Sequence, residues 1–339
     1  MARAAANRSR QAGRSRASSN GASQDSDTLT TKFAALLAAS KPVLIDGGLA
    51  TQCEAMGHNI DGELWSAKLL QTNPRALVDA TRAFLDAGAK IVATASYQAS
   101  RRGLMATGLS AAESDDLIRS SVALARQACD EFVADNPEAD RPLVAASIGP
   151  YGAILHDGSE YTGDYDISVE DLRGFHAERL AVLDDSDADL LACETIPSGA
   201  EAKVLAELLR DTRLPSWVSF SCADAVHLAD GTPLAEAAGR FAGHRRVLAV
   251  GANCVPPGLV LPLIAAIKAA APDKAIVVYP NSGEIYRAED NAWLGTATPM
   301  QCEQAASEWI EAGASLVGGC CRIGPDQVAA MSRSVTKAG

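Results

Sequence analysis

The chain has 339 residues, and one (β/α)8 barrel, which normally takes about 250 residues, would fill most of it. A net charge of −12 disfavours binding to nucleic acid or to an anionic membrane surface. The longest apolar run, residues 259–271, is interrupted by Pro262 and Lys268 and is shorter than the roughly 20 residues that span a bilayer.

Residues 1–27 carry five arginines among Ala, Ser, Asn and Gly, with no acid before Asp25. We expect this tail to be disordered, because it contains too little apolar surface to fold. An organelle transit peptide has the same composition, but a flexible tail or an early start codon explains it equally well. Eight cysteines without an apolar signal segment fit a reducing compartment, so we expect a cytoplasmic protein with free thiols. The folded domain is expected over residues 28–335.

Short apolar segments alternate with helical patterns along this domain. Apolar residues recur at helical spacing, for example at Leu77, Ala80 and Phe84. The expected strands are 43–46, 90–95, 143–148, 189–194, 217–221, 247–254, 275–279 and 315–318. Helix boundaries are indicated by capping boxes at Ser110 with Glu113 and Ser198 with Glu201, by Pro299 and Pro325 at first turns, and by Gly88 and Gly313 at exits.

Eight strands in this alternation favour a parallel (β/α)8 barrel with the helices outside. The alternative is a doubly wound open sheet. Such a sheet more often carries a glycine-rich phosphate turn after its first strand, and residues 46–50 lack the G-x-G-x-x-G spacing. In a barrel, the catalytic groups lie at the C-terminal ends of the strands.

Three cysteines stand at two of these strand ends. Cys254 ends one strand, and Cys320 and Cys321 follow two glycines after the last strand. Three thiolates can hold zinc and leave its fourth position open for a substrate. A redox switch through a strained Cys320–Cys321 disulfide is an alternative. Packing as small buried hydrophobes is the ordinary fate of free cysteine, and it fits Cys53, Cys129, Cys193, Cys222 and Cys302 better than a vicinal pair after glycines.

Two carboxylates, Asp46 and Glu194, also stand at strand ends. Such acids commonly cap a helix or pair with a basic residue. Because this rim has little basic character, the two carboxylates can instead receive a substrate ammonium group. The backbone N–H groups of Gly47 and Gly48 can bind a carboxylate. Together these groups predict a site that holds both ends of an amino acid.

Several of these motifs resemble those of the homocysteine S-methyltransferase family, and the likeness runs from about residue 33 to 333. The segments that carry it are 46–51 (DGGLAT), 94–98 (TASYQ), 149–152 (GPYG), 194–197 (ETIP), 279–284 (YPNSGE) and 318–321 (GGCC), together with the Asn253-Cys254 pair. The segment 279–284 looks most like the small, single-domain branch of the family.

The resemblance implies a zinc enzyme that methylates L-homocysteine to L-methionine, with Cys254, Cys320 and Cys321 as ligands. It further implies that Asp46 and Glu194 hold the amino group and that the Gly47–Gly48 turn holds the carboxylate. Family donors are S-methylmethionine and S-adenosylmethionine in the small branch and betaine in another. Selenocysteine as acceptor and a zinc or thiol redox protein stay as alternatives. Our candidates for the donor side are Tyr97, Gln98, Asn281 and Glu284.

Overall fold

The computed structural model describes residues 32–39, 41–60, 66–283, 285–287, 292–294 and 298–338. Residues 1–27 lie outside these ranges, so the predictions about the tail, including its disorder and any role in targeting, stay predictions. Within the described ranges, no helix has both the length and the apolar character that a membrane span requires.

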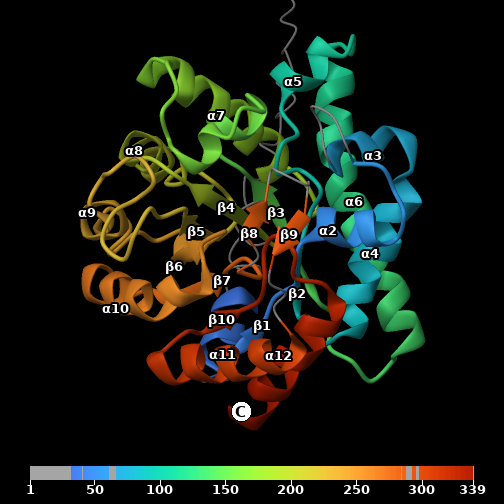
Figure 1. Cartoon of the computed structure of the whole chain (residues 1–339). Helices are drawn as coiled ribbons and strands as arrows, with labels where there is room; N and C mark the ends of the chain where they lie inside the picture. Colours follow the sequence, from blue (N-terminus) through green and yellow to red (C-terminus); the bar gives the residue numbers. More distant parts are fainter. Residues whose placement is uncertain are drawn as a thin grey trace, which may run out of the picture.

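The eight expected strands all form, and they pair in parallel as one sheet in the order β1-β10-β7-β6-β5-β4-β3-β2. A parallel bridge between Ile45 and Ile91 joins β1 to β2, which closes the sheet into a barrel at the centre of the molecule (Figure 1). The strands are β1 (Val43–Leu44), β2 (Ile91–Ala93), β3 (Leu143–Ile148), β4 (Leu190–Ile196), β5 (Ser216–Phe220), β6 (Val247–Asn253), β7 (Ala275–Tyr279) and β10 (Leu316–Val317). Each expected boundary is correct to within two residues.

Helices surround the barrel (Figure 1). They are α2 (Leu49–Ala55), α3 (Ser66–Thr72), α4 (Pro74–Asp86), α5 (Arg101–Ala106), α6 (Ala111–Asp135), α7 (Val169–Asp184), α8 (Gly199–Leu208), α9 (Leu234–Gly239), α10 (Val260–Ala270), α11 (Pro299–Ala312) and α12 (Pro325–Ala338), with short 3-10 turns η1 (Tyr151–Ile154), η2 (Ser159–Tyr161) and η3 (Pro257–Leu259). Their buried faces pack against the outside of the sheet in one large apolar core. The sequence did not predict the antiparallel pair β8 (Ile285–Arg287) and β9 (Ala292–Leu294), whose strands are too short for a periodic pattern.

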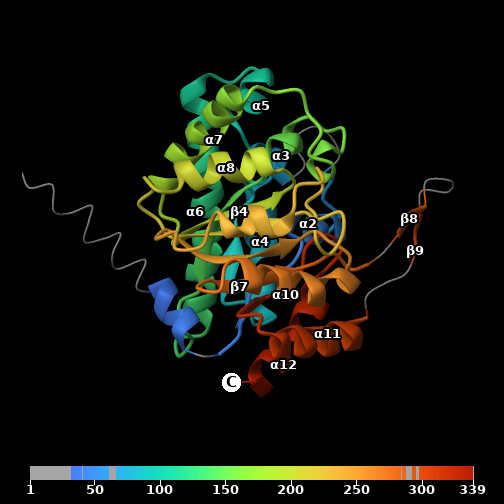
Figure 2. The same cartoon turned by 90° about the vertical axis from the view of Figure 1, so that its left-hand side faces the viewer.

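The barrel interior forms a second apolar cluster, built from inward-facing residues such as Ile91, Leu190 and Trp217. Phe33, on a helix over residues 32–38, joins this cluster and lies 6.4 Å from Trp217 between ring centroids. Figure 2 shows this first helix and the β8–β9 pair on opposite sides of the barrel. The N-terminal end of the barrel is therefore filled, and open space remains at the C-terminal ends of the strands.

Most of the predicted helix boundaries are confirmed. Ser110 and Glu113 form the capping box of α6, and Gly88 and Gly313 adopt the left-handed conformation at helix exits, with φ of 107° and 111°. The predicted box at Ser198 and Glu201 is half wrong. Ser198 Oγ accepts a hydrogen bond from the Glu201 N–H at 3.2 Å, but the Glu201 carboxylate turns into the protein and accepts from the Tyr151 N–H at 2.7 Å.

Candidate active site

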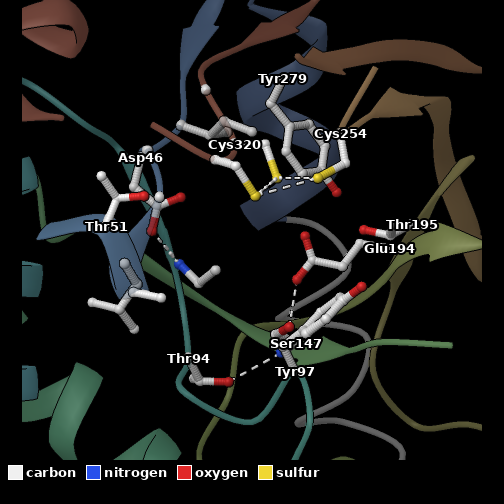
Figure 3. A pocket seen from close by; sticks show the side chains of 18 of the residues that line it. Asp46, Thr51, Thr94, Tyr97, Ser147, Glu194, Thr195, Cys254, Tyr279 and Cys320 are labelled. Atoms are coloured by element: carbon white, nitrogen blue, oxygen red, sulfur yellow. Dashed lines mark hydrogen bonds between the residues drawn. The ribbon is translucent and has the colours of Figure 1, made fainter. Parts of the chain in front are cut away.

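A pocket opens at the C-terminal ends of the strands (Figure 3). It brings together most of the residues that the sequence indicated. Among the residues that line it are Asp46, Gly47, Gly48, Thr51, Tyr97, Gln98, Ser147, Tyr161, Glu194, Cys254, Tyr279, Cys320 and Cys321.

The three predicted cysteines converge at one wall of this pocket. The Sγ of Cys254 lies 3.1 Å from that of Cys320 and 3.5 Å from that of Cys321, and the two vicinal sulfurs are 4.0 Å apart. Sulfurs bound at about 2.3 Å to a tetrahedral zinc would be about 3.8 Å apart. Among the described residues no fourth His, Cys, Asp or Glu joins the group. The donor set therefore fits a metal ion with an open position rather than a closed structural site.

Backbone packing places the vicinal pair. A Cβ on Gly319 would lie 2.1 Å from the Ile323 side chain, and one on Gly318 would lie 2.4 Å from Ile45. Neither glycine has a positive φ, so close approach rather than conformational freedom requires them. Cys254 does have a positive φ, 53°. Such a conformation is costly for a residue with a side chain and is found preferentially at functional sites.

The thiols cannot all ionise without a cation beside them. Hydrogen bonds with Cys254 and Cys321, together with burial, raise the pKa of Cys320 well above the ordinary range. Hydrogen bonds from Cys254 and Cys320 lower the pKa of Cys321. One thiolate is thus stabilised at the expense of the others, and a divalent cation would allow all three to be deprotonated.

Asp46 and Glu194 lie on either side of the space beside the sulfurs (Figure 3). Asp46 is 7% exposed and accepts a hydrogen bond from the Ala93 N–H at 2.7 Å; Glu194 is 9% exposed and accepts from the Ser147 hydroxyl. Burial raises the pKa of Asp46 to about 7 and that of Glu194 to about 6. Among the residues that the structure describes, no Lys, Arg or His lines the pocket. Two buried carboxylates without a cation form a site for an ammonium group.

Arg179 of α7 lies behind this wall and does not neutralise the carboxylates directly. Its guanidinium donates to the carbonyls of Gly149, Ser96 and Tyr97 at 2.8, 3.0 and 2.7 Å. It therefore ties the loops after β2 and β3 together, and it fixes the backbone that carries the Tyr97 ring into the pocket.

The turn at Gly47 and Gly48 has fewer backbone N–H groups available for a substrate carboxylate than the sequence suggested. The Gly48 N–H is already donated to the Ile323 carbonyl at 2.9 Å. Gly47 lines the pocket, and its N–H makes no hydrogen bond to another described residue. A Cβ on Gly47 would lie 2.4 Å from the Ile323 carbonyl oxygen. The predicted carboxylate contact therefore rests on Gly47 rather than on both glycines.

The four residues predicted to bind the methyl donor are not all found in this pocket. Tyr97 and Gln98 line the pocket, and Gln98 donates to the Ala153 carbonyl at 3.2 Å. Asn281 lines a second cavity, beside Gln301 and Trp309. Glu284 lies outside the described residues. Ser147 and Tyr161 also line the pocket, although neither of them was assigned a role from the sequence.

A barrel with paired carboxylates and a thiol triad that could hold a metal ion at its strand ends defines a class of barrel enzymes. Comparison with known proteins narrows this class. The sequence model of the family described as homocysteine S-methyltransferase matches residues 43–335. The homocysteine S-methyltransferase of Escherichia coli is 45% identical over 313 residues, which cover 88% of this chain and 96% of that protein. Homocysteine S-methyltransferase YbgG of Bacillus subtilis is 43% identical over 300 residues, 86% of this chain and 95% of its own length.

A solved structure agrees with these relatives. The metallated form of the Escherichia coli homocysteine methyltransferase MmuM superposes with a TM-score of 0.79 at 42% identity, covering 88% of this chain and 98% of that one. This chain therefore belongs to the homocysteine S-methyltransferase family, and it is a methyltransferase.

Proposed function

We propose that this enzyme transfers a methyl group from a sulfonium donor, S-methylmethionine or S-adenosylmethionine, to the thiol of L-homocysteine, and that it uses zinc held by Cys254, Cys320 and Cys321. The observation that carries the proposal is the placement of three mutually close sulfurs beside two uncompensated carboxylates in one pocket. When bound there, zinc would supply the positive charge that keeps the homocysteine sulfur deprotonated at neutral pH.

The remaining contacts orient the acceptor. Asp46 and Glu194 bind its ammonium group from two sides, and the Gly47 N–H binds its carboxylate. Both carboxylates are buried, so each would bind an ammonium group more strongly than an exposed acid would. The ammonium group in turn lowers the pKa of both acids, because its positive charge stabilises their ionised forms.

The methyl transfer then follows from positions and charges. The homocysteine thiol releases its proton to solvent water, and a lone pair of the sulfur forms a new S–CH3 bond. The bond between that methyl group and the donor sulfur breaks, and its electron pair stays on the donor sulfur. A thiolate and a sulfonium become two neutral thioethers, so an apolar, water-poor pocket favours the reaction. With S-methylmethionine both products are methionine.

A zinc-storage or thiol redox role would account for the cysteines alone. It leaves Asp46 and Glu194 without a purpose, although each is a buried carboxylate held by a hydrogen bond from the protein. The methyltransferase proposal accounts for both sets of residues.

The test is to measure methionine formed from homocysteine by the purified zinc protein, with each sulfonium donor and betaine offered separately. Cys320→Ala should lose bound zinc and methyl transfer together. Cys129→Ala, in the outer core on α6, removes a similar thiol and should retain both. Full methyl transfer by a zinc-free Cys320→Ala protein would refute the proposed chemistry.

A further inference from the structure

A third buried carboxylate, that of Glu160, belongs to the residue before Tyr161 of the pocket wall and has no part in the scheme above. It is 4% exposed, and its Oε2 is fully buried without a hydrogen-bond partner. The groups that act on its charge most strongly, after burial and its own N–H, are Asp157 and Cys321, and neither is basic. An ionised carboxylate left in this state is costly unless something supplies the missing cation.

The turn that carries Glu160 is held against the site. Its neighbour Tyr161 lines the pocket, with its hydroxyl 3.9 Å from Cys254 Sγ. The turn packs on η1 so closely that a Cβ on Gly152 would lie 2.5 Å from the Glu160 nitrogen. The Glu160 charge also acts on Tyr97, which lies in the pocket wall. Glu160 therefore stands on a turn packed against the pocket wall, on a different element from Asp46 and Glu194.

Two amino acids must meet in this pocket if the donor is S-methylmethionine, and each brings an ammonium group. In the proposed function, Asp46 and Glu194 already bind the ammonium group of the acceptor, homocysteine. We infer that Glu160 binds the α-ammonium group of the methyl donor and so selects donors that are α-amino acids. This inference rests on the proposed function and extends it to the donor.

The unpartnered oxygen, Glu160 Oε2, is a hydrogen-bond acceptor, and this determines which kind of cation it binds best. An ammonium group offers N–H donors as well as charge, whereas a sulfonium or the quaternary nitrogen of betaine offers charge alone. The donor sulfonium must also face the thiols so that its methyl group can transfer. The ammonium group, three carbons away from that sulfur, is the part of the donor that is free to reach the pocket wall.

The experiment compares two donors in the zinc-loaded full-length enzyme. S-methylmethionine carries the α-ammonium group, and dimethylsulfoniobutyrate has the same sulfonium and carboxylate without it. We expect Glu160→Gln to lower the kcat/KM for S-methylmethionine, divided by that for dimethylsulfoniobutyrate, at least about tenfold. The reason is that the variant loses the charge-assisted hydrogen bond to the donor ammonium group. The KM for homocysteine and the zinc content should stay as in the wild type.

Asp157→Asn is the matched control, since it removes the same charge from an exposed position in the same loop and keeps an acceptor for the Ser159 N–H. Its donor ratio should equal that of the wild type. An unchanged ratio in Glu160→Gln, or an equal loss with both donors, would overturn the inference while leaving the proposed function intact. Absence of methionine from the wild type with every sulfonium donor would instead overturn the proposed function.

Discussion

Asn253 and Thr195 bind each other twice across the ends of β6 and β4. The Thr195 N–H donates to Asn253 Oδ1 at 2.7 Å, and Asn253 Nδ2 donates to the Thr195 hydroxyl at 2.7 Å. Thr195 and the next residue after Asn253, Cys254, both have positive φ, 60° and 53°. Each such conformation costs about 1–3 kcal/mol and persists only where its surroundings enforce it. The amide pair therefore couples the strand end that carries Glu194 to the one that carries Cys254.

We predict that Asn253→Leu weakens metal binding although Asn253 is not a proposed ligand. The substitution keeps the branched shape but leaves the Thr195 N–H buried without an acceptor, so the free energy of unfolding should fall by about 1–3 kcal/mol. Zinc affinity should fall about tenfold or more, because support around ligands affects affinity on that scale. Competition with a chelator measures the affinity. Ser219→Ala removes one other contact to Asn253 and should have a smaller effect; equal effects of the two variants would contradict the coupling.

The stability of the zinc-free, substrate-free protein should depend on pH through Asp46 and Glu194. Burial raises their pKa values to about 7 and 6, against about 4 in an unfolded chain. The folded state holds these protons more tightly, so the contribution to stability is complete below about pH 4 and is lost as pH rises through 6 and 7. Each group contributes a slope of about 1.4 kcal/mol per pH unit within its window.

Denaturant unfolding between pH 4 and pH 8 measures this effect as a difference between proteins. Asp46→Asn with Glu194→Gln should be more stable than the wild type at pH 8 and should show a flatter profile. A wild-type profile parallel to that of the double variant would show that the two carboxyl groups do not titrate in this way.

Gly319→Ala should disrupt the metal site through packing alone. The added methyl group would lie 2.1 Å from the Ile323 side chain, which must shift and pull on the backbone next to Cys320. We expect a lower melting temperature and weaker zinc binding. Gly258→Ala is the matched control, because nothing lies within 4 Å of its Cβ position. If both variants retain wild-type zinc affinity, close approach is not what requires glycine at 319.

Arg179→Met should weaken binding of the methyl donor without removing any side chain that lines the pocket. The substitution leaves the carbonyls of Gly149, Ser96 and Tyr97 without their charged donor, and the unfolding free energy should fall by about 1–3 kcal/mol. Because Tyr97 then loses its backbone support, the KM for the donor should rise more than the KM for homocysteine. Steady-state kinetics with each substrate varied in turn checks this. Arg119→Met, on the surface of α6, should leave both constants unchanged.

Much of the site was predictable because each group follows a strand. Asp46, Glu194, Cys254 and the vicinal cysteines come directly after apolar segments, and the C-terminal ends of parallel strands meet at one end of a barrel. Side chains alternate along a strand, so the neighbours Cys193 and Glu194 face opposite ways. Cys193 packs in the outer core and Glu194 lines the pocket.

Residues in the loops beyond the strand ends were not predictable in the same way. Asn281 follows β7 within two residues yet lines another cavity, and the Gly48 N–H binds Ile323, which is distant in the sequence. Glu160 stands next to Tyr161 of the pocket wall only because its turn packs on η1. Periodicity and capping residues report local structure, so the sequence by itself determined the eight strands and which groups stand at their ends. The direction of a loop side chain depends on long-range contacts such as those of Arg179, which only the tertiary structure decided.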